Sequence, residues 1–265
     1  MIRVCVAGAT GWVGRSLVPA LVAAPDVELV GAVSRVAGGK SLGEALGIAG
    51  LSLVVSGTVE EALKVPTDVL IDYTSPESVK ANVLFAIGRK VHVVIGTSGL
   101  NDDNYQEIGE AAQRRGVGVL AAGNFAISAV LLQHFAAIAA RFMPSWEVID
   151  YSDASKPDAP SGTTRELVHR LAAVGNPKVE IPIGETQGSP EARGLTLNGT
   201  QIHSIRLPGY VLAAEVIFGK PNERLSLRLD GGSGAEPYVD GTLLAVRRVS
   251  NFVGLRRGLD QVLDL

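Results

Sequence analysis

Near its N-terminus the chain reads Arg3-Val4-Cys5-Val6-Ala7-Gly8-Ala9-Thr10-Gly11-Trp12-Val13-Gly14, an apolar run joined directly to three spaced glycines. Apolar residues with helical spacing follow over 15–24, and a run rich in β-branched residues covers 27–33. A strand, a glycine-rich turn, a helix and a second strand form the first unit of a doubly wound dinucleotide-binding fold. Glycines permit the tight turn and the close approach of a pyrophosphate to helix N–H groups. A purely structural turn is the alternative, but its position between strand and helix favours a cofactor site.

Alternating strand and helix patterns continue as far as residue 125. Short apolar runs predict strands at 69–73, 92–95 and 118–122. The segments beside them predict helices at 58–63, 77–89 and 101–113. This alternation is typical of a parallel sheet with right-handed crossovers.

A different pattern begins near residue 128. Segments 128–141, 164–174, 238–249 and 255–263 predict helices, the last returning to the first domain. A strand is predicted at 147–151, before the helix at 164–174. Consecutive strands joined by short turns are predicted at 202–206, 210–218 and 224–229, which indicates an antiparallel or mixed sheet. The polar, glycine-rich segment 183–197 predicts a mobile loop.

The predicted fold class is therefore α/β, with a Rossmann-type doubly wound parallel sheet and a second α+β domain whose sheet is mixed or antiparallel. We assign residues 1–125 and 240–265 to dinucleotide binding. We assign residues 126–239 to substrate binding and oligomerisation.

The composition is that of an ordinary globular protein. Hydrophobic residues make up 46% of the 265 residues and charged residues 19%, with a formal net charge of −3. This small negative charge does not indicate a nucleic-acid-binding protein. No apolar run reaches the roughly 18 residues that a membrane helix needs. The single Cys5 excludes a disulfide within the chain, and no Cys/His spacing indicates a metal site. Because a strand follows the N-terminus without a signal-peptide pattern, we expect a cytoplasmic protein.

The end of the second strand predicts which dinucleotide binds. An acidic residue there would bond the ribose hydroxyls, whereas this chain has Ser34-Arg35, and a guanidinium pairs with a 2′-phosphate. We expect NADPH as the preferred cofactor and NADH as a second; stacking of Arg35 on the adenine is the alternative. Gly96 and Ser98 end a later strand and are expected near the nicotinamide. The predicted cofactor-binding residues are Gly8, Thr10, Gly11, Trp12, Val13, Ser34, Arg35, Tyr73, Thr74, Gly96, Ser98, Gly123, Asn124 and Phe125.

A second stretch with several chemically active groups reads Ser152-Asp-Ala-Ser-Lys-Pro-Asp-Ala-Pro-Ser-Gly-Thr163. Its two prolines exclude a helix interior or a central strand, and a hydroxyl near its end can cap the helix that follows. Lys156 beside the free N–H groups of that helix makes an anion site, and Ser161, Gly162 and Thr163 are the predicted substrate-binding residues. The alternative is a capped surface loop without a ligand.

Taken together, the chain resembles the dihydrodipicolinate reductase family. The matching segments are 6–14, 94–99, 124–125, 156–163, 202–209 and 215–219, and the most specific is Lys-Pro-Asp-Ala-Pro-Ser-Gly-Thr at 156–163. The resemblance implies a Rossmann domain and a mixed-sheet domain that builds homotetramers. It also implies NAD(P)H-dependent reduction of a cyclic unsaturated dicarboxylate in lysine biosynthesis. Within 202–209 we take Arg206 as a substrate-binding residue and His203 as structural.

Several positions depart from the family pattern. The family has two adjacent histidines before the lysine, the first a proposed proton donor, and this chain has Ser152 and Asp153 there. Ala213-Ala214 stands in place of a frequent His-Gln pair, and Leu229 in place of a frequent histidine. The catalytic candidates are Lys156 as carboxylate partner or proton donor, Ser152 acting through a relay, and Asp153 as an acid if burial raises its pKa.

These departures favour a remodelled substrate site. The main interpretation is an NAD(P)H-dependent reductase of a cyclic imine or enamine other than the usual dicarboxylate. One alternative is the family's own lysine-pathway reaction, and a further alternative is a non-catalytic dinucleotide-binding protein. Trp12 stands where the family often has arginine, which predicts weaker cofactor binding. We interpret His92, His134 and His169 as structural, because no metal-type partner is near them in the sequence.

Overall fold

The computed structural model describes residues 1–263, which divide into two compact units. The first unit holds Met1–Ile127 with Ala235–Leu265, and the second holds Ser128–Gly234. Residues 264 and 265, the end of the predicted 240–265 segment, lie outside the described residues. The assignment of cofactor binding to one unit, and of substrate binding and oligomerisation to the other, stays a prediction.

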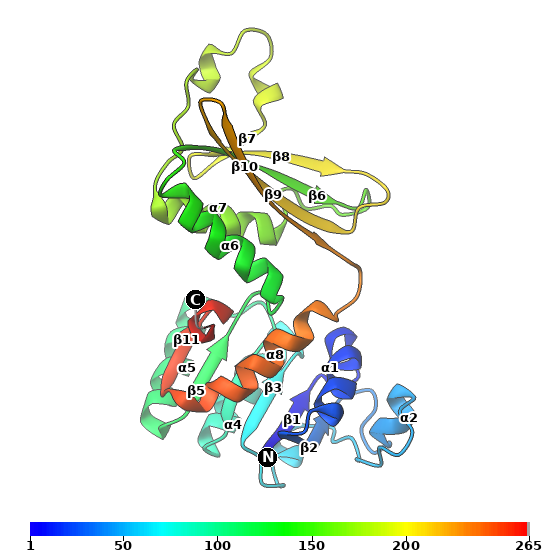
Figure 1. The fold of residues 1–265 in the computed structure, drawn as a ribbon. Helices are drawn as coiled ribbons and strands as arrows, with labels where there is room; N and C mark the ends of the chain where they lie inside the picture. The colour runs from blue at the N-terminus through cyan, green and yellow to red at the C-terminus, as the bar shows by residue number, and fades with distance from the viewer. Residues whose placement is uncertain (264–265) are drawn as a thin grey trace. The chain divides into compact units, whose positions relative to one another are not determined.

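A six-stranded parallel sheet forms the centre of the first unit, with the strand order β11-β5-β4-β3-β1-β2 (Figure 1). The chain moves outward from β1 in both directions, so a ligand-binding crevice is expected at the carboxyl ends of β1 and β3. The central strands are continuous buried runs, as parallel strands covered on both faces are. The strands are β1 (Ile2–Ala7), β2 (Val27–Val33), β3 (Val69–Asp72), β4 (His92–Ile95), β5 (Gly118–Ala121) and β11 (Gly254–Arg257).

Helices cover the two faces of this sheet (Figure 1). Helices α4 and α5 share a core with one set of alternating strand residues, and α1 packs against α8. Local chemistry sets the ends of α5, which begins with a capping box between Asn101 and Asn104 and stops at Gly116, whose φ is 71°. The helices are α1 (Trp12–Ala23), α2 (Leu42–Leu46), α3 (Val59–Ala62), α4 (Pro76–Gly88), α5 (Asp102–Arg115) and α8 (Pro237–Arg248).

A five-stranded mixed sheet forms the second unit, with the order β10-β9-β6-β8-β7. Strands β6 and β8 are parallel, and the other pairs are antiparallel. One face of the sheet packs on α6 (Ile127–Ala140) and α7 (Gly162–Val174) around Trp146, Val148 and Phe218. The strands are β6 (Ser145–Ser152), β7 (Leu195–Leu197), β8 (Thr200–Arg206), β9 (Leu212–Lys220) and β10 (Glu223–Gly231). The predicted fold class, a Rossmann-type sheet plus a mixed-sheet α+β unit, is confirmed.

The predicted helix over 255–263 is wrong. Gly254–Arg257 form β11, which pairs in parallel with β5, and a 3₁₀ turn at Leu259–Val262 follows. Gly254 and Gly258 have φ values of 92° and 102°, far from helical geometry, and β5 offers backbone partners that outweigh local preference. The sequence also did not predict α2. Segment 183–197 contains two 3₁₀ turns, Ile183–Glu185 and Pro190–Arg193, before β7, and its mobility stays a prediction.

Candidate active site

The turn between β1 and α1 packs against the end of β3. Gly8 has a φ of 85°, and a Cβ there would lie 2.2 Å from the carbonyl oxygen of Tyr73. A Cβ at Gly14 would lie 2.4 Å from the carbonyl oxygen of Ala9. Glycine is therefore required at both positions. Gly11 has no side chain with which to cap α1, so the first N–H groups of the helix are available to an anion.

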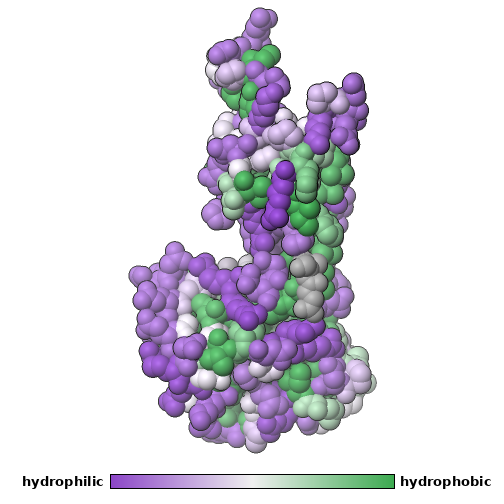
Figure 2. Space-filling view, turned by 60° about the vertical axis from the view of Figure 1, so that its left-hand side comes forward, coloured by the Kyte–Doolittle hydropathy of each residue, from purple (hydrophilic) through white to green (hydrophobic). Residues whose placement is uncertain are grey.

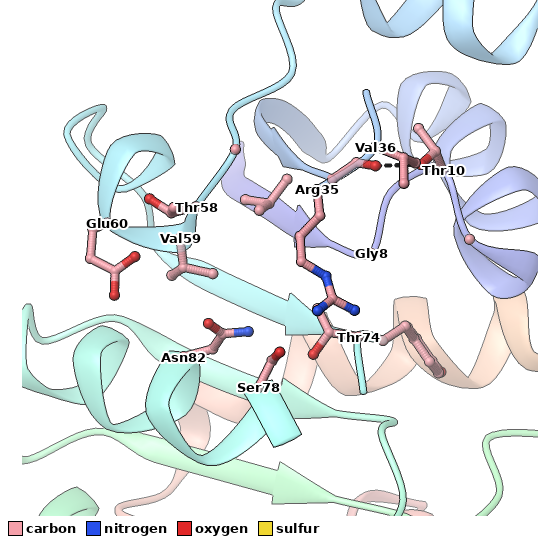
Figure 3. A pocket seen from close by; sticks show the side chains of 15 residues that line it. Gly8, Thr10, Arg35, Val36, Thr58, Val59, Glu60, Thr74, Ser78 and Asn82 are labelled. Atoms are coloured by element: carbon pink, nitrogen blue, oxygen red, sulfur yellow. Dashed lines mark hydrogen bonds between the residues drawn. The ribbon is translucent and has the colours of Figure 1, made fainter. Parts of the chain in front are cut away.

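A cavity of about 410 Å³ opens at the ends of β1, β2 and β3 (Figure 3). The hydroxyl oxygens of Thr10 and Ser34 lie 2.7 Å apart and join the glycine turn to the end of β2. Arg35 is exposed and extends into the cavity, toward Thr74 and Ser78 in the view of Figure 3. The cavity is lined by Gly8, Thr10, Gly11, Val33, Ser34, Arg35, Val36, Gly57, Thr58, Val59, Glu60, Tyr73, Thr74, Ser78 and Asn82.

A second cavity of about 410 Å³ lies at the ends of β3, β4 and β5 and shares Gly11, Tyr73 and Thr74 with the first. A Cβ at Gly96 would lie 2.0 Å from the Tyr73 ring, so glycine allows that ring to pack on the end of β4. The shared lining makes the two cavities neighbouring parts of one elongated site. The second cavity is lined by Gly11, Trp12, Val13, Tyr73, Thr74, Pro76, Gly96, Thr97, Ser98, Gly123, Phe125 and Tyr238.

The buried carboxylate of Asp72 organises the strand ends between the cavities. Its Oδ1 accepts hydrogen bonds from Thr74 Oγ1 at 2.7 Å and from Thr97 Oγ1 at 2.8 Å. Its Oδ2 accepts one from Asn82 Nδ2 at 2.8 Å. One carboxylate thus fixes the segments that follow β3 and β4, where a ligand is expected.

A second buried carboxylate, Asp150 on β6, organises the loop of the second unit. It accepts hydrogen bonds from Ser161 N at 2.9 Å, Thr164 Oγ1 at 3.0 Å and Arg206 Nη2 at 2.7 Å. Burial by itself would raise the pKa of Asp150, but the hydrogen bonds from these partners outweigh burial and lower it. Asp150 therefore carries a negative charge at neutral pH and holds the start of α7 against the sheet.

The loop that this carboxylate anchors contains Lys156. The Nζ of Lys156 lies 3.0 Å from Asp158 Oδ1, and both side chains are about one-third exposed. Ser161 caps α7 by accepting a hydrogen bond from Thr164 N at 3.3 Å. Within residues 1–263, no atom beyond its chain neighbours and its own helix backbone lies within 4 Å of the place where a Cβ at Gly162 would be. The start of α7 therefore presents N–H groups beside open space and near a cation of the same loop.

The three other predicted residues of this loop region have different surroundings. Ser152 is fully buried, and its Oγ has no hydrogen-bond partner within residues 1–263. Asp153 accepts hydrogen bonds from Ser155 Oγ and Ser155 N, which lower its pKa, so it lacks the raised pKa that an acid would need. Arg206 donates to Asp150 and, at 2.6 Å, to the carbonyl oxygen of Asp158. These bonds make Arg206 an organiser of the loop, a role that the sequence did not predict.

Comparison with known proteins identifies the family. The model described as "Dihydrodipicolinate reductase, N-terminus" matches residues 2–125, and the model described as "Dihydrodipicolinate reductase, C-terminus" matches residues 128–263. The chain belongs to the dihydrodipicolinate reductase family. It is an NAD(P)H-dependent oxidoreductase, and the interpretation as a non-catalytic dinucleotide-binding protein is dropped.

Individual relatives agree with this family over nearly the whole chain. A 4-hydroxy-tetrahydrodipicolinate reductase of Synechococcus elongatus is 40% identical, covering 99% of this chain and 98% of the relative. The protein of the same name from Desulfitobacterium hafniense is 38% identical, covering 99% of both chains. The dipicolinate-bound dihydrodipicolinate reductase of Paenisporosarcina sp. TG-14 has a TM-score of 0.87 at 30% identity, with 99% of this chain and 100% of that one covered.

The residues of this reductase fit a dinucleotide in the first unit. The glycine turn forms a cradle that side chains would fill, and the cavities beside it contain every predicted cofactor residue except Asn124. Asn124 Oδ1 instead accepts a hydrogen bond from Ala126 N at 2.8 Å. That the contained residues bind the cofactor stays a prediction.

Sequence reasoning missed several residues of the reductase site. Asp72 and Asp150 lie within predicted strands. An acidic residue inside a strand that is expected to be buried indicates a paired carboxylate, and this was the signal in the sequence. Asn82 and Tyr238 lie on helices, and no local pattern in the sequence connects them with the glycine turn. Thr97 stands between two predicted residues and was omitted.

Two of the histidines, His203 and His92, have polar contacts within the reductase. His203 Nε2 lies 2.7 Å from Glu147 Oε2, whose other oxygen lies 2.7 Å from Arg193 Nη2. Gly118 N donates to His92 Nδ1 at 2.9 Å, and burial lowers the pKa of His92. Within residues 1–263 no group of three His, Cys, Asp or Glu side chains is placed to hold a metal ion. No helix of this described part is long and apolar enough to span a membrane.

Proposed function

We propose that this chain is the 4-hydroxy-tetrahydrodipicolinate reductase of a cytoplasmic lysine-biosynthesis pathway. The observation that carries the proposal is the near-complete alignment with proteins of that name, at up to 40% identity. The loop over 156–163 supports it, because its lysine and the helix start after it suit a carboxylate-bearing substrate. This function replaces the remodelled-substrate interpretation as the first candidate.

The carboxylate site is built from the loop and the start of α7. Lys156 supplies a positive charge, and Gly162 and Thr163 supply N–H groups from the first turn of the helix. Asp150 holds this first turn in place through Ser161 and Thr164. The arrangement neutralises one carboxylate of the substrate without further movement of the helix end.

The cofactor site is built from the first unit. Bound NADPH would supply a hydride to an electrophilic carbon of a C=N bond or of a conjugated C=C bond. The start of α1 would hold the pyrophosphate, and Arg35 would pair with the 2′-phosphate. Ser34 replaces the acidic residue that would favour NADH, so NADPH is the preferred cofactor.

The reduced substrate also needs a proton on the atom next to the carbon that accepts the hydride. Hydrogen bonds lower the pKa of Asp153 and of Asp158, the latter chiefly through Lys156, so both are carboxylates at neutral pH. The Lys156 ammonium group is the charged donor that remains in this loop. We assign the proton to Lys156, which regains it from solvent after each turnover.

A second candidate is the reduction of a cyclic imine that lacks the second carboxylate. The observation in its favour is the pair Ser152 and Asp153. Ser152 is buried and cannot donate to a ligand without rearrangement. The Asp153 carboxylate adds negative charge to the turn that leads to Lys156, whose backbone N–H donates to the carbonyl oxygen of Asp153 at 3.1 Å. A doubly negative substrate would be bound less well beside this carboxylate.

Turnover separates the two candidates. Aspartate semialdehyde, pyruvate and the preceding synthase generate the dicarboxylate, and the expected result is NADPH oxidation by the purified protein. No oxidation there, combined with oxidation in the presence of a monocarboxylic or neutral cyclic imine, would favour the second candidate. Lys156→Ala should reduce kcat by ~100-fold and leave NADPH affinity unchanged. Lys220→Ala, at the exposed end of β9, is the matched control and should retain activity.

We also propose that the second unit builds a homotetramer. Its exposed large hydrophobic side chains include Phe135, Ile138, Phe142 and Leu225, and Figure 2 shows hydrophobic surface on this unit. Strand β10 lies at an edge of the sheet, where further pairing is open to it. Light scattering should give four times the chain mass of 27.6 kDa. The chain mass itself would contradict the proposal.

A further inference from the structure

Aromatic side chains gather around the second cavity. Aromatic residues make up 5% of the chain, yet Trp12, Tyr73, Phe125 and Tyr238 all line this one cavity. They form two edge-to-face pairs. The ring centroids of Trp12 and Tyr238 lie 5.5 Å apart with the planes at 68°, and those of Tyr73 and Phe125 lie 5.9 Å apart at 66°.

The two pairs differ in burial. Phe125 is 1% exposed, and the Tyr73 hydroxyl lies 2.8 Å from Thr242 Oγ1, so this pair forms a fixed wall. Trp12 is 59% exposed, although it is the largest kind of apolar side chain, and its partner Tyr238 is partly exposed. The exposed pair therefore has aromatic surface available to a ligand in the cavity.

The position of the exposed pair indicates which ligand it meets. Trp12 is the first residue of α1, and Tyr238 is the second residue of α8, so the pair bridges the starts of two helices. No Lys, Arg, Asp or Glu side chain appears in the described lining of this cavity, whereas Arg35 and Glu60 line the first. This cavity therefore offers a ligand aromatic surface, hydroxyl groups and the N–H groups at the helix starts, and no charged side chain of the described lining. Of the two halves of a dinucleotide, the nicotinamide half suits this lining, because its ring is flat and carries no phosphate beyond the shared pyrophosphate.

We propose that Trp12 and Tyr238 form an aromatic cover for the second cavity and bind the nicotinamide half of the cofactor by packing on it. Tyr238, which no sequence motif assigns, is the residue that positions the indole. Packing on this cover replaces part of the cofactor affinity that a positively charged side chain at residue 12 would provide by pairing with the pyrophosphate. The proposal depends on the dinucleotide chemistry of the family and not on the identity of the second substrate.

Binding of whole and partial cofactors tests the cover. Trp12→Ala should weaken NADPH binding by roughly 10- to 100-fold, the usual effect of losing an aromatic stacking partner. The same variant should bind adenosine 2′,5′-bisphosphate, which occupies only the first cavity, as the unchanged protein does. Arg35→Ala should weaken both ligands, and Trp12→Phe should retain most of the NADPH affinity. Tyr238→Ala should weaken NADPH by about fivefold and also spare the bisphosphate.

Fluorescence gives a readout that needs no activity. The chain has two tryptophans, and Trp146 is buried in the second unit with its Nε1 donating to Thr200 Oγ1 at 3.0 Å. Reduced nicotinamide absorbs where tryptophan emits, so NADPH should quench Trp12 by energy transfer. Quenching should persist in Trp146→Phe and fall strongly in Trp12→Phe.

Two results would overturn the cover. One is an equal loss of NADPH and of the bisphosphate in Trp12→Ala, in a variant whose Tm matches that of the unchanged protein. The other is unchanged NADPH affinity in that variant. Neither measurement uses the dicarboxylate, so a failure of the proposed function would leave these binding results interpretable.

Discussion

Arg206 Nη2 lies 2.7 Å from Asp150 Oδ2, and this ion pair joins the ends of two parallel strands to the first turn of α7. The Asp150 side chain is fully buried, and that of Arg206 is 16% exposed. The two residues lie on neighbouring strands, because β6 and β8 align Asp150 with Ser204 and Ser152 with Arg206. The loop that carries Lys156 therefore takes its conformation from a buried pair outside the loop.

Removing the arginine should destabilise the second unit. Arg206→Ala leaves the buried Asp150 carboxylate without its charged partner, and losses of about 3–5 kcal/mol in the free energy of unfolding are usual for such changes. Urea denaturation followed by fluorescence measures the loss. Lys178→Ala removes an exposed pair with Glu180 in the same unit and should change little. Equal stability of the two variants would show that the buried pair does not hold the loop.

The same carboxylate predicts a pH dependence. The pKa of Asp150 is lower in the folded protein than its ordinary value of 3.8. The ionised carboxylate therefore adds its full contribution to the free energy of unfolding above pH 3.8, and this contribution is lost as the pH falls through the lowered pKa. The stability difference between the unchanged protein and Asp150→Asn should therefore be constant from pH 7 to about pH 5 and should shrink at lower pH. A difference that grows on acidification would reverse the assigned direction.

Arg35 should determine the choice of cofactor. Arg35→Ala removes a charge-assisted contact to the 2′-phosphate and should weaken NADPH by about 10- to 100-fold, with NADH affected much less. Titration calorimetry with both cofactors measures this ratio, and Arg114→Ala on the exposed face of α5 is the control. Ser34→Glu should raise NADH affinity through the ribose hydroxyls. Equal weakening of both cofactors by Arg35→Ala would instead support stacking on the adenine.

Gly96 should be intolerant of a side chain. A Cβ there would lie 2.0 Å from the Tyr73 ring, which itself packs on Phe125, so Gly96→Ala must displace a wall of the second cavity. We expect at least a tenfold loss of NADPH affinity. Gly88→Ala should leave affinity unchanged, because in the described part of the chain no atom outside its own helix backbone and chain neighbours lies within 4 Å of the added Cβ. Normal binding by Gly96→Ala would mean that the ring is not part of the site.

Much of the site followed from local sequence. The glycine turn was predictable because a Cβ at Gly8 would meet the backbone that follows β3 and a Cβ at Gly14 would meet the backbone of the turn itself, so only glycine fits at both positions. The strands of the first unit were predictable because buried parallel strands are continuous apolar runs. The strand within 255–263 was not predictable from local sequence, because β11 forms by pairing with β5, which lies more than a hundred residues earlier.

The sequence by itself determined the fold class, the family and the residues of the glycine turn, because each depends on spacing and composition within short windows. Tertiary structure decided which of the polar residues near Lys156 hold the loop in place. The sequence predicts Arg206 as a substrate-binding residue, and only the pairing of β6 with β8 places it beside Asp150. Trp12 and Tyr238 are 226 positions apart, and only the packing of α1 against α8 makes them neighbours. The physical reason is the same in both cases: these contacts join segments far apart along the chain, and no local pattern contains them.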